Sequence, residues 1–247
     1  MQLQPTPCYI CWVWEADDLI HDSAQFFSAQ PFSAPSFAAE LWSDGRQAGV
    51  DEVGIGPLAG PVYAAAVILN PMRPVSGLAD SKAISEGKRK RLAAEIKCRS
   101  HAWAIASASE AEIDRMNILA ASHLAMRRAV AGLGTEPTMI YVDGNKSPHM
   151  RYPVVAVVKG DRRVPQISAA SILAKVARDE LMVELDSVYP GYGFARHKGY
   201  PTRAHFAALQ ELGPSPVHRQ SFAPVQACLN FSDGMAAGGP GTQEMVS

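Results

Sequence analysis

The sequence has few cysteines, no long apolar run and almost no net charge, and each shortage narrows the possible classes of protein. Only four of the 247 residues are cysteine, without disulfide-style spacing, so a disulfide-stapled secreted scaffold is not expected. No apolar run reaches the roughly 20 residues that a membrane-spanning helix needs. The first residues lack the basic start and apolar core of a secretory signal. We therefore expect a cytoplasmic protein with no membrane partner.

The small net charge of −1 hides an uneven distribution along the chain. Residues 1–47 carry −5 and residues 225–247 carry −2, which leaves +6 on residues 48–224. A basic middle is compatible with a polyanionic partner such as a nucleic acid, without requiring one.

What is present suits one globular domain with extensions. Hydrophobic residues make up 47% of the chain, enough for one sizeable core. Residues 1–46 show no periodicity and are rich in Ser, Pro, Ala and Phe, so we expect a poorly ordered extension. Residues 47–227 are the expected catalytic domain. Residues 228–247 end in a glycine-rich stretch and are expected to form a flexible tail.

The domain has a mixed pattern of short apolar runs and helical periodicity. Strands are expected at Gln47–Val53, Val62–Leu69, Ala102–Ser107, Met139–Val142 and Val154–Val158. Helices are expected at Glu86–Arg99, Glu110–Leu133, Gln166–Leu185 and Pro201–Leu212. Strands first, then alternating helices and strands, predict an α/β domain built on one mixed sheet.

Acidic residues follow several of these strands. Asp51 and Glu52 close the first, Asp143 closes the fourth, and Asp161 follows the fifth. Ligands gather outside strand ends in open α/β sheets. Carboxylates brought together there repel one another unless a cation lies between them, and hard oxygen ligands suit Mg²⁺ or Mn²⁺. Two such ions can activate water and stabilise a leaving oxygen in phosphodiester cleavage.

Each acid alone has a simpler interpretation. A single Asp-Gly after a strand is usually a turn. Asp51 and Glu52 are neighbours in a strand, so their side chains point to opposite faces unless a bulge or the strand's end redirects one. The residue pattern by itself leaves metal chemistry and ordinary turns about equally open.

A glycine-spaced turn, Gly54-Ile55-Gly56, follows the first acids. Two positions without Cβ let the backbone approach a ligand closely and expose its polar groups. The simpler alternative is a tight turn that only starts the next strand. The six-residue dinucleotide-binding motif is not complete, because Ala59 stands where its third glycine would be.

Several segments together resemble ribonuclease HII, of the ribonuclease H-like superfamily. The most specific are AGVDEVGIGPLAGPV, SAASILAKVARD and YGFARHKGYPT, and the resemblance covers roughly Ala48 to Val225. It implies a ribonuclease H-like sheet flanked by helices, with a helical C-terminal part. It also implies an endonuclease that hydrolyses the RNA strand of RNA–DNA hybrids and cuts 5′ to single ribonucleotides in duplex DNA, leaving 5′-phosphate and 3′-hydroxyl ends. We expect a monomer.

The resemblance also assigns roles to individual residues. The four acids that bind Mn²⁺ or Mg²⁺ in the family correspond to Asp51, Glu52, Asp143 and Asp161. The backbone of the glycine turn would read the ribose 2′-hydroxyl, which distinguishes RNA from DNA. Further substrate-binding positions are Ser81, Lys82, Lys175 and Tyr200. Among these, Lys82 is expected to contact phosphate and Tyr200 to stack at the junction.

The sequence departs from the family at a few of these positions. Ile55 stands where the family has arginine, so a charge and up to five donors near the scissile phosphate are missing. Gln220 replaces an arginine, and Ala83-Ile84 replaces a basic-Leu pair. Our hypothesis is that backbone reading of the 2′-hydroxyl persists while affinity or rate falls.

Two other functions remain open. One is a DNA nuclease of the same superfamily, although the glycine turn and Tyr200 both belong to ribonucleotide reading. The other is a hybrid-binding protein whose activity is weakened by Ile55, although all four acids are present. The Cys8-Tyr-Ile-Cys11 pair has no second pair or His nearby and predicts no metal site. The run Lys88–Arg91 fits a phosphate-tracking patch and a solvated helix face equally well.

Overall fold

The computed structural model describes residues 45–78, 81 and 84–236. Residues 1–44, which make up nearly all of the predicted N-terminal extension and include Cys8 and Cys11, lie outside the described part. So do Lys82 and residues 237–247.

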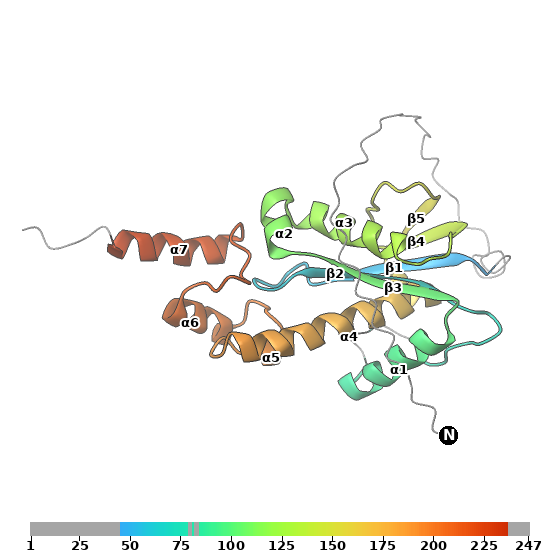
Figure 1. The fold of residues 1–247 in the computed structure, drawn as a ribbon, viewed down its shortest axis with the longest axis horizontal. Helices are drawn as coiled ribbons and strands as arrows, with labels where there is room; N and C mark the ends of the chain where they lie inside the picture. Colours follow the sequence, from blue (N-terminus) through green and yellow to red (C-terminus); the bar gives the residue numbers. More distant parts are fainter. Residues whose placement is uncertain (1–44, 79–80, 82–83, 237–247) are drawn as a thin grey trace, which may run out of the picture. The chain divides into compact units, whose positions relative to one another are not determined.

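A mixed sheet of five strands, in the order β3-β2-β1-β4-β5, forms the centre of the described region (Figure 1). The strands are β1 (Gln47–Val53), β2 (Val62–Ile68), β3 (Ala102–Ala108), β4 (Met139–Asp143) and β5 (Val154–Val157). The first three pair antiparallel, whereas β4 pairs in parallel with β1 and β5 in parallel with β4. The carboxyl ends of β1, β4 and β5 therefore meet at one edge of the sheet. The predicted α/β class and mixed sheet are confirmed.

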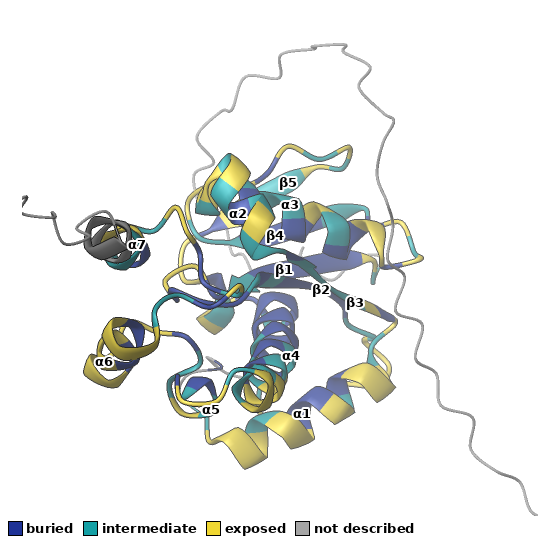
Figure 2. Cartoon of the chain, turned by 60° about the vertical axis from the view of Figure 1, so that its left-hand side comes forward, coloured by how far each residue is buried: buried dark blue, intermediate teal, exposed yellow. Residues whose placement is uncertain are grey.

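Helices cover both faces of the sheet (Figures 1 and 2). They are α1 (Glu86–Arg99), α2 (Glu110–Met116), α3 (Ile118–Ala131), α4 (Pro165–Val188), α5 (Phe194–His197), α6 (Arg203–Leu212) and α7 (Ala223–Ala236), with a 3₁₀ turn, η2 (Gly160–Arg162). The alternation along β2 explains the two layers: Ala66 and Ile68 pack with α3, whereas Ala65 and Val67 pack with α1 and α4.

The single helix expected over Glu110–Leu133 is wrong, because Asn117 divides it into α2 and α3. Asn117 has φ +72°, a left-handed conformation that asparagine tolerates better than most residues. Its side chain caps α3 by accepting a hydrogen bond from the Ala120 N–H. At the start of α2, Ser109 and Glu112 form a reciprocal capping box. Two strong caps outweigh the continuous apolar periodicity.

The C-terminal helices form a smaller apolar cluster with the end of α4. Its buried members include Leu58, Met182, Phe194, Leu209 and Val225. Helix α7 continues to Ala236, so it extends into the range expected to be a flexible tail. Among the described helices, none is long and apolar enough to span a bilayer.

Candidate active site

The parallel pairing of β1 with β4 brings two of the predicted acids side by side. Val50 pairs with Val142, so the next residues, Asp51 within β1 and Asp143 at the end of β4, lie side by side at the same edge of the sheet. The pairing of β1 with β2 is continuous through Val53, and the described strand contains no bulge at the acids. The bulge that was considered for Asp51 and Glu52 is therefore not the means by which their carboxylates approach each other.

Asp161 follows the end of β5, in the 3₁₀ turn η2. The N–H of Gly160 donates a 2.6 Å hydrogen bond to Oδ1 of Asp143. The next residue, Asp161, lies half-buried in the 3₁₀ turn η2. A Cβ at Gly160 would lie 3.3 Å from the same Asp143 oxygen, so glycine permits this close approach. The backbone contact ties the η2 turn to the acid on β4.

Asp51 lies in a strongly perturbed environment. It is only 6% exposed. Burial raises the pKa of Asp51 well above its usual value, and the charges of Glu52 and Asp143 raise it further. Hydrogen bonds from Ser171 and from the Glu52 N–H, 2.8 Å from Oδ1, favour the ionised form. The carboxylate is therefore held by donors at a place where neighbouring negative charge opposes its ionisation.

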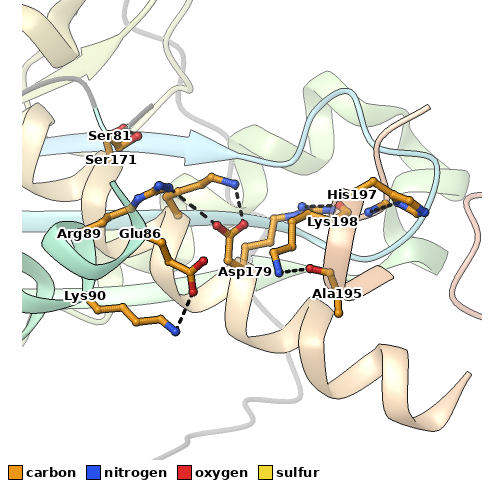
Figure 3. Close-up of polar contacts among 12 residues, drawn as sticks. Ser81, Glu86, Arg89, Lys90, Ser171, Asp179, Ala195, His197 and Lys198 are labelled. Carbon is orange, nitrogen blue, oxygen red and sulfur yellow. Dashed lines mark hydrogen bonds and ion pairs between the residues drawn. The ribbon is translucent and has the colours of Figure 1, made fainter. Parts of the chain in front are cut away.

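Ser171, on α4, is a site residue that the sequence reasoning missed. Its hydroxyl lies 2.9 Å from that of Ser81, and both side chains are buried (Figure 3). Ser81 thus reaches the acid cluster through Ser171. Helix α4 can lie this close to β1 because Gly49, two residues before Asp51, has no side chain: a Cβ there would lie only 2.5 Å from Cβ of Gln166.

The chemistry of this cluster fits a divalent cation, although the side chains do not form a closed ligand set as they stand. Within the described residues, no three His, Cys, Asp or Glu side chains converge tightly enough to enclose a metal ion. Asp51, Glu52 and Asp143 nevertheless form an all-oxygen donor group. The charges of Glu52 and Asp143 oppose the ionisation of Asp51, and a cation would relieve this repulsion.

Two buried arginines lie beneath the glycine turn after β1 and the segments next to it. Gly54 has φ +98° and is buried, whereas Ile55 and Gly56 are exposed. Arg219 donates to the carbonyl oxygens of Gly54 (2.6 Å), Ile55 (2.9 Å) and Gly60 (2.9 Å). Both guanidinium groups are fully buried.

The second of these arginines, Arg178, serves the neighbouring segments. It donates to the carbonyl oxygens of Ala59 (3.0 Å), Pro61 (3.1 Å) and Lys198 (3.0 Å). Neither arginine was identified as a site residue from the sequence. Arg178 does fall in the SAASILAKVARD string of the family resemblance, and Arg219 directly precedes Gln220, one of the positions that depart from the family.

Tyr200 lies next to the turn. A Cβ placed on Gly56 would be 3.8 Å from Cε1 of Tyr200, whose side chain is partly exposed. His205 Nδ1 donates to the Tyr200 carbonyl (3.0 Å), and the Tyr200 N–H donates to the carbonyl of His197 (2.9 Å). The predicted sugar-reading turn and the predicted stacking residue therefore share one surface.

Several of the basic residues that the sequence analysis considered form ion pairs. Lys175 Nζ donates to Asp179 Oδ1 at 2.5 Å, and Arg89 of α1 lies 3.8 Å from the other oxygen of Asp179 (Figure 3). Burial lowers the pKa of Lys175, which Asp179 partly offsets. Lys90 instead pairs with Glu86 on the exposed side of α1. The run Lys88–Arg91 is thus split between an interhelical ion pair and a solvated face.

Comparisons with known proteins show which family the chain is similar to. The ribonuclease HII family model matches residues 48–225. The ribonuclease HII of Laribacter hongkongensis is 61% identical over 188 residues, which cover 75% of this chain and 95% of that protein.

Solved structures show the same fold. The ribonuclease H2 of Pyrococcus horikoshii matches with a TM-score of 0.63 and 25% identity, over 75% of this chain and 97% of that one. Bst-RNase HIII in complex with Mn²⁺ matches with a TM-score of 0.61 and 20% identity, over 81% of this chain and 74% of that one. The second likeness concerns the fold alone.

Proposed function

The chain belongs to the ribonuclease HII family and is a ribonuclease H, and from this premise we propose that it cuts duplex DNA 5′ to single embedded ribonucleotides as well as the RNA strand of RNA–DNA hybrids. The products would carry 5′-phosphate and 3′-hydroxyl ends. One observation carries the proposal: the acids Asp51 and Glu52 are followed directly by the turn Gly54-Ile55-Gly56, which adjoins Tyr200. A phosphodiester held at the acids would therefore have its sugar within reach of the turn.

Ribonucleases H of this kind depend on divalent metal ions, and we propose that Asp51, Glu52, Asp143 and Asp161 hold Mg²⁺ or Mn²⁺ here. Such ions, acting as a pair, would supply an activated water and stabilisation of the leaving oxygen. The protein's part is to orient the acids. Ser171 and the Glu52 N–H donate to Asp51, and the Gly160 N–H donates to Asp143.

The proposed substrate contacts lie around these acids. The backbone of Gly54, Ile55 and Gly56 would read the 2′-hydroxyl, and the ring of Tyr200 would stack on the nucleotide after the ribonucleotide. Ser81, Lys82 and Lys175 are the proposed contacts to the backbone of the nucleic acid. For Lys175 this requires sharing its ammonium group between a phosphate and Asp179, which it already contacts.

The decisive experiment is cleavage of a labelled DNA duplex that holds one ribonucleotide, beside a continuous RNA–DNA hybrid and a pure DNA duplex, each with Mg²⁺ or Mn²⁺. We expect a cut immediately 5′ to the ribonucleotide, cleavage of the hybrid, and intact DNA. Cleavage of pure DNA would favour a DNA nuclease of the superfamily. Binding of the hybrid without any cleavage would favour the hybrid-binding alternative.

The remaining proposals concern the unit that acts. We propose that residues 47–227 form the catalytic domain, because Val225 packs in the same apolar cluster as Leu58, two residues after the glycine turn. We propose further that it acts as a monomer in the cytoplasm. Light scattering of the full chain at micromolar concentration tests whether the protein is a monomer, and a dimer would contradict the proposal.

A further inference from the structure

Arg219 is bound to the glycine turn through both its side chain and its backbone. The guanidinium donates to the carbonyl oxygens of Gly54 and Ile55, and Nε donates to that of Gly60. The Arg219 N–H donates to the carbonyl of Leu58 at 2.9 Å. The turn and the segment around Arg219, which are more than 150 residues apart in the chain, therefore form one rigid unit.

These contacts determine where the N–H groups of the turn point. A trans peptide is planar, with its C=O and N–H directed oppositely, and the described chain contains no cis peptide. The carbonyls of Gly54 and Ile55 face the buried guanidinium. The N–H groups in the same two peptides, those of Ile55 and Gly56, must therefore point away from Arg219. Both residues are exposed, so the two N–H groups are directed to the outer surface beside Tyr200.

We infer that Arg219 is a positioning residue for ribonucleotide recognition, which orients the Ile55 and Gly56 N–H groups as an outward pair of donors toward the 2′-hydroxyl and the adjoining phosphate. This inference rests on the proposed function and names the group that makes the turn selective. Adjacent outward N–H groups form a favourable site for an anion or a hydroxyl oxygen. Their orientation does not depend on the side chain at position 55, so the reading survives the replacement of arginine by Ile55.

The energetic cost of this arrangement supports a specific role. A buried charge is unfavourable unless its donors are satisfied. Burial and the neighbouring charge of Arg178 lower the pKa of Arg219. The guanidinium is retained nonetheless, and three carbonyl oxygens and the face of the Phe222 ring, 5.2 Å away, compensate it. Lysine has one nitrogen and cannot reach oxygens on three sides of a planar fork.

Arg178 provides a matched control. It is equally buried and also donates to three carbonyl oxygens, but these belong to Ala59, Pro61 and Lys198 and not to the two peptides of the turn. Replacing it should disturb the same neighbourhood, including the loop that carries Tyr200, without turning the Ile55 and Gly56 N–H groups. Base stacking does not distinguish ribose from deoxyribose, so any loss of affinity should affect both duplexes alike.

The test compares the parent with R219K and R178K. Binding of a DNA duplex with one ribonucleotide and of the identical all-deoxy duplex is measured with Ca²⁺ in place of Mg²⁺. Thermal unfolding is measured for each protein, and hydrogen exchange of residues 54–60 follows the turn directly. We expect R219K to reduce the ratio of the two affinities about tenfold, the effect of roughly 1.4 kcal/mol, and to speed exchange in the turn. R178K should keep the ratio of the parent.

The outcomes separate this inference from the function on which it rests. A parent without preference for the ribonucleotide duplex would overturn both. A parent with that preference, which R219K retains in folded form, would overturn the role of Arg219 alone. Equal loss of the preference in R219K and R178K, in proportion to lost stability, would also overturn it, because a general structural role then suffices. If R219K does not fold, R219Q, which keeps a planar donor without the charge, takes its place under the same criteria.

Discussion

Gly54 and the side chain of Arg178 are in direct contact, at a position where no other residue type fits. A Cβ on Gly54 would lie 2.7 Å from Cδ of Arg178 and closer still to its Nε. The φ of +98° is also outside the range that side-chain-bearing residues adopt readily. The first turn glycine is thus required by the buried arginine beneath it as well as by any ligand above it.

We therefore predict different effects of Gly54→Ala and Gly56→Ala on stability and cleavage. The first should lower the free energy of unfolding by roughly 2–4 kcal/mol, through strain and overpacking, and abolish cleavage. The second meets only Tyr200, at 3.8 Å, and should leave stability within about 0.5 kcal/mol while weakening substrate affinity. Urea unfolding and steady-state cleavage measure both. Equal stability of the two variants would contradict the packing at Gly54.

The acid cluster leads to a prediction about metal and stability. Because burial, Glu52 and Asp143 raise the pKa of Asp51, its ionisation destabilises the metal-free fold. The protonated carboxyl of Asp51 stabilises the fold relative to the ionised one. This contribution to stability is present below the unfolded pKa of Asp51 and is lost as the pH rises through its folded pKa. At neutral pH, Asp51→Asn should therefore raise the melting temperature of the metal-free protein and abolish cleavage.

Metal ions should reverse the order of the two melting temperatures. Mn²⁺ or Mg²⁺ should neutralise the acid cluster of the parent, and should therefore raise its melting temperature by much more than that of Asp51→Asn. Differential scanning calorimetry with chelator and with millimolar metal ion provides the comparison. Glu95→Gln, at a partly exposed position of α1 where the side chain pairs with Arg99, is the control and should respond as the parent does. A parent that metal does not stabilise would argue against this site.

The strands, the acids and the turn could be predicted from the sequence because their signals are local. Apolar runs bounded by Gly and Pro marked the strands, and strand-end acids can be seen without knowing the partner strand. Arg178 and Arg219 could not be found in this way, since a lone arginine normally indicates a solvated surface. All but one of their acceptors, the Lys198 carbonyl, are backbone carbonyls more than 100 residues away, which leave no trace in composition. Ser171 was missed for the same reason, as a small residue within an Ala-rich helix.

Two histidines in the C-terminal part, His205 and His218, predict a dependence of stability on pH. The Ser215 N–H donates to Nδ1 of His218, so His218 carries its proton on Nε2 and donates it to His205 Nε2 at 3.0 Å. His205 in turn donates from Nδ1 to the Tyr200 carbonyl. Protonation of His218 or His205 therefore removes an acceptor that the network needs. Burial, followed by the charge of His205, lowers the pKa of His218 to about 4.

A base whose folded pKa is depressed binds more protons when unfolded. The contribution of His218 should therefore be complete above its unfolded pKa of about 6.5 and be lost toward pH 4, on the order of 3 kcal/mol in all. Urea unfolding at pH 7.5, 6 and 5 measures it as the difference between the parent and His218→Asn, in which shared effects such as that of Asp51 cancel. His101→Asn, at an exposed position, should keep the parent's dependence. A difference that is flat with pH would refute the assignment.

The ion pairs around Asp179 predict a contrast between buried and exposed pairs. Asp179 is shared by Lys175 and Arg89, whose side chains are 14% and 11% exposed. Asp179→Ala leaves two positive charges facing each other and should cost about 2–4 kcal/mol. Glu86→Ala breaks the Lys90 pair, whose side chains are more than half exposed, and should cost less than about 0.5 kcal/mol. Equal losses in urea unfolding would mean that Asp179 does not hold α1 against α4.

Ile55 provides the last prediction, because it separates affinity from selectivity. Its side chain is 41% exposed beside Gly56 and Tyr200, so a longer residue fits without repacking the core. Ile55→Arg would add one phosphate contact, raise kcat/KM several-fold and steepen the salt dependence of binding by about one charge. The preference for a ribonucleotide over a deoxynucleotide should not change, since Arg219 sets the orientation of the N–H groups of the turn.

Ile55→Leu, which adds no charge, is the control and should match the parent. Cleavage and binding of the single-ribonucleotide and all-deoxy duplexes from low to moderate salt measure both effects. Equal kcat/KM in Ile55→Arg and the parent would mean that the missing arginine costs this protein nothing, and a gain in ribonucleotide preference would mean that the side chain at position 55 takes part in the reading.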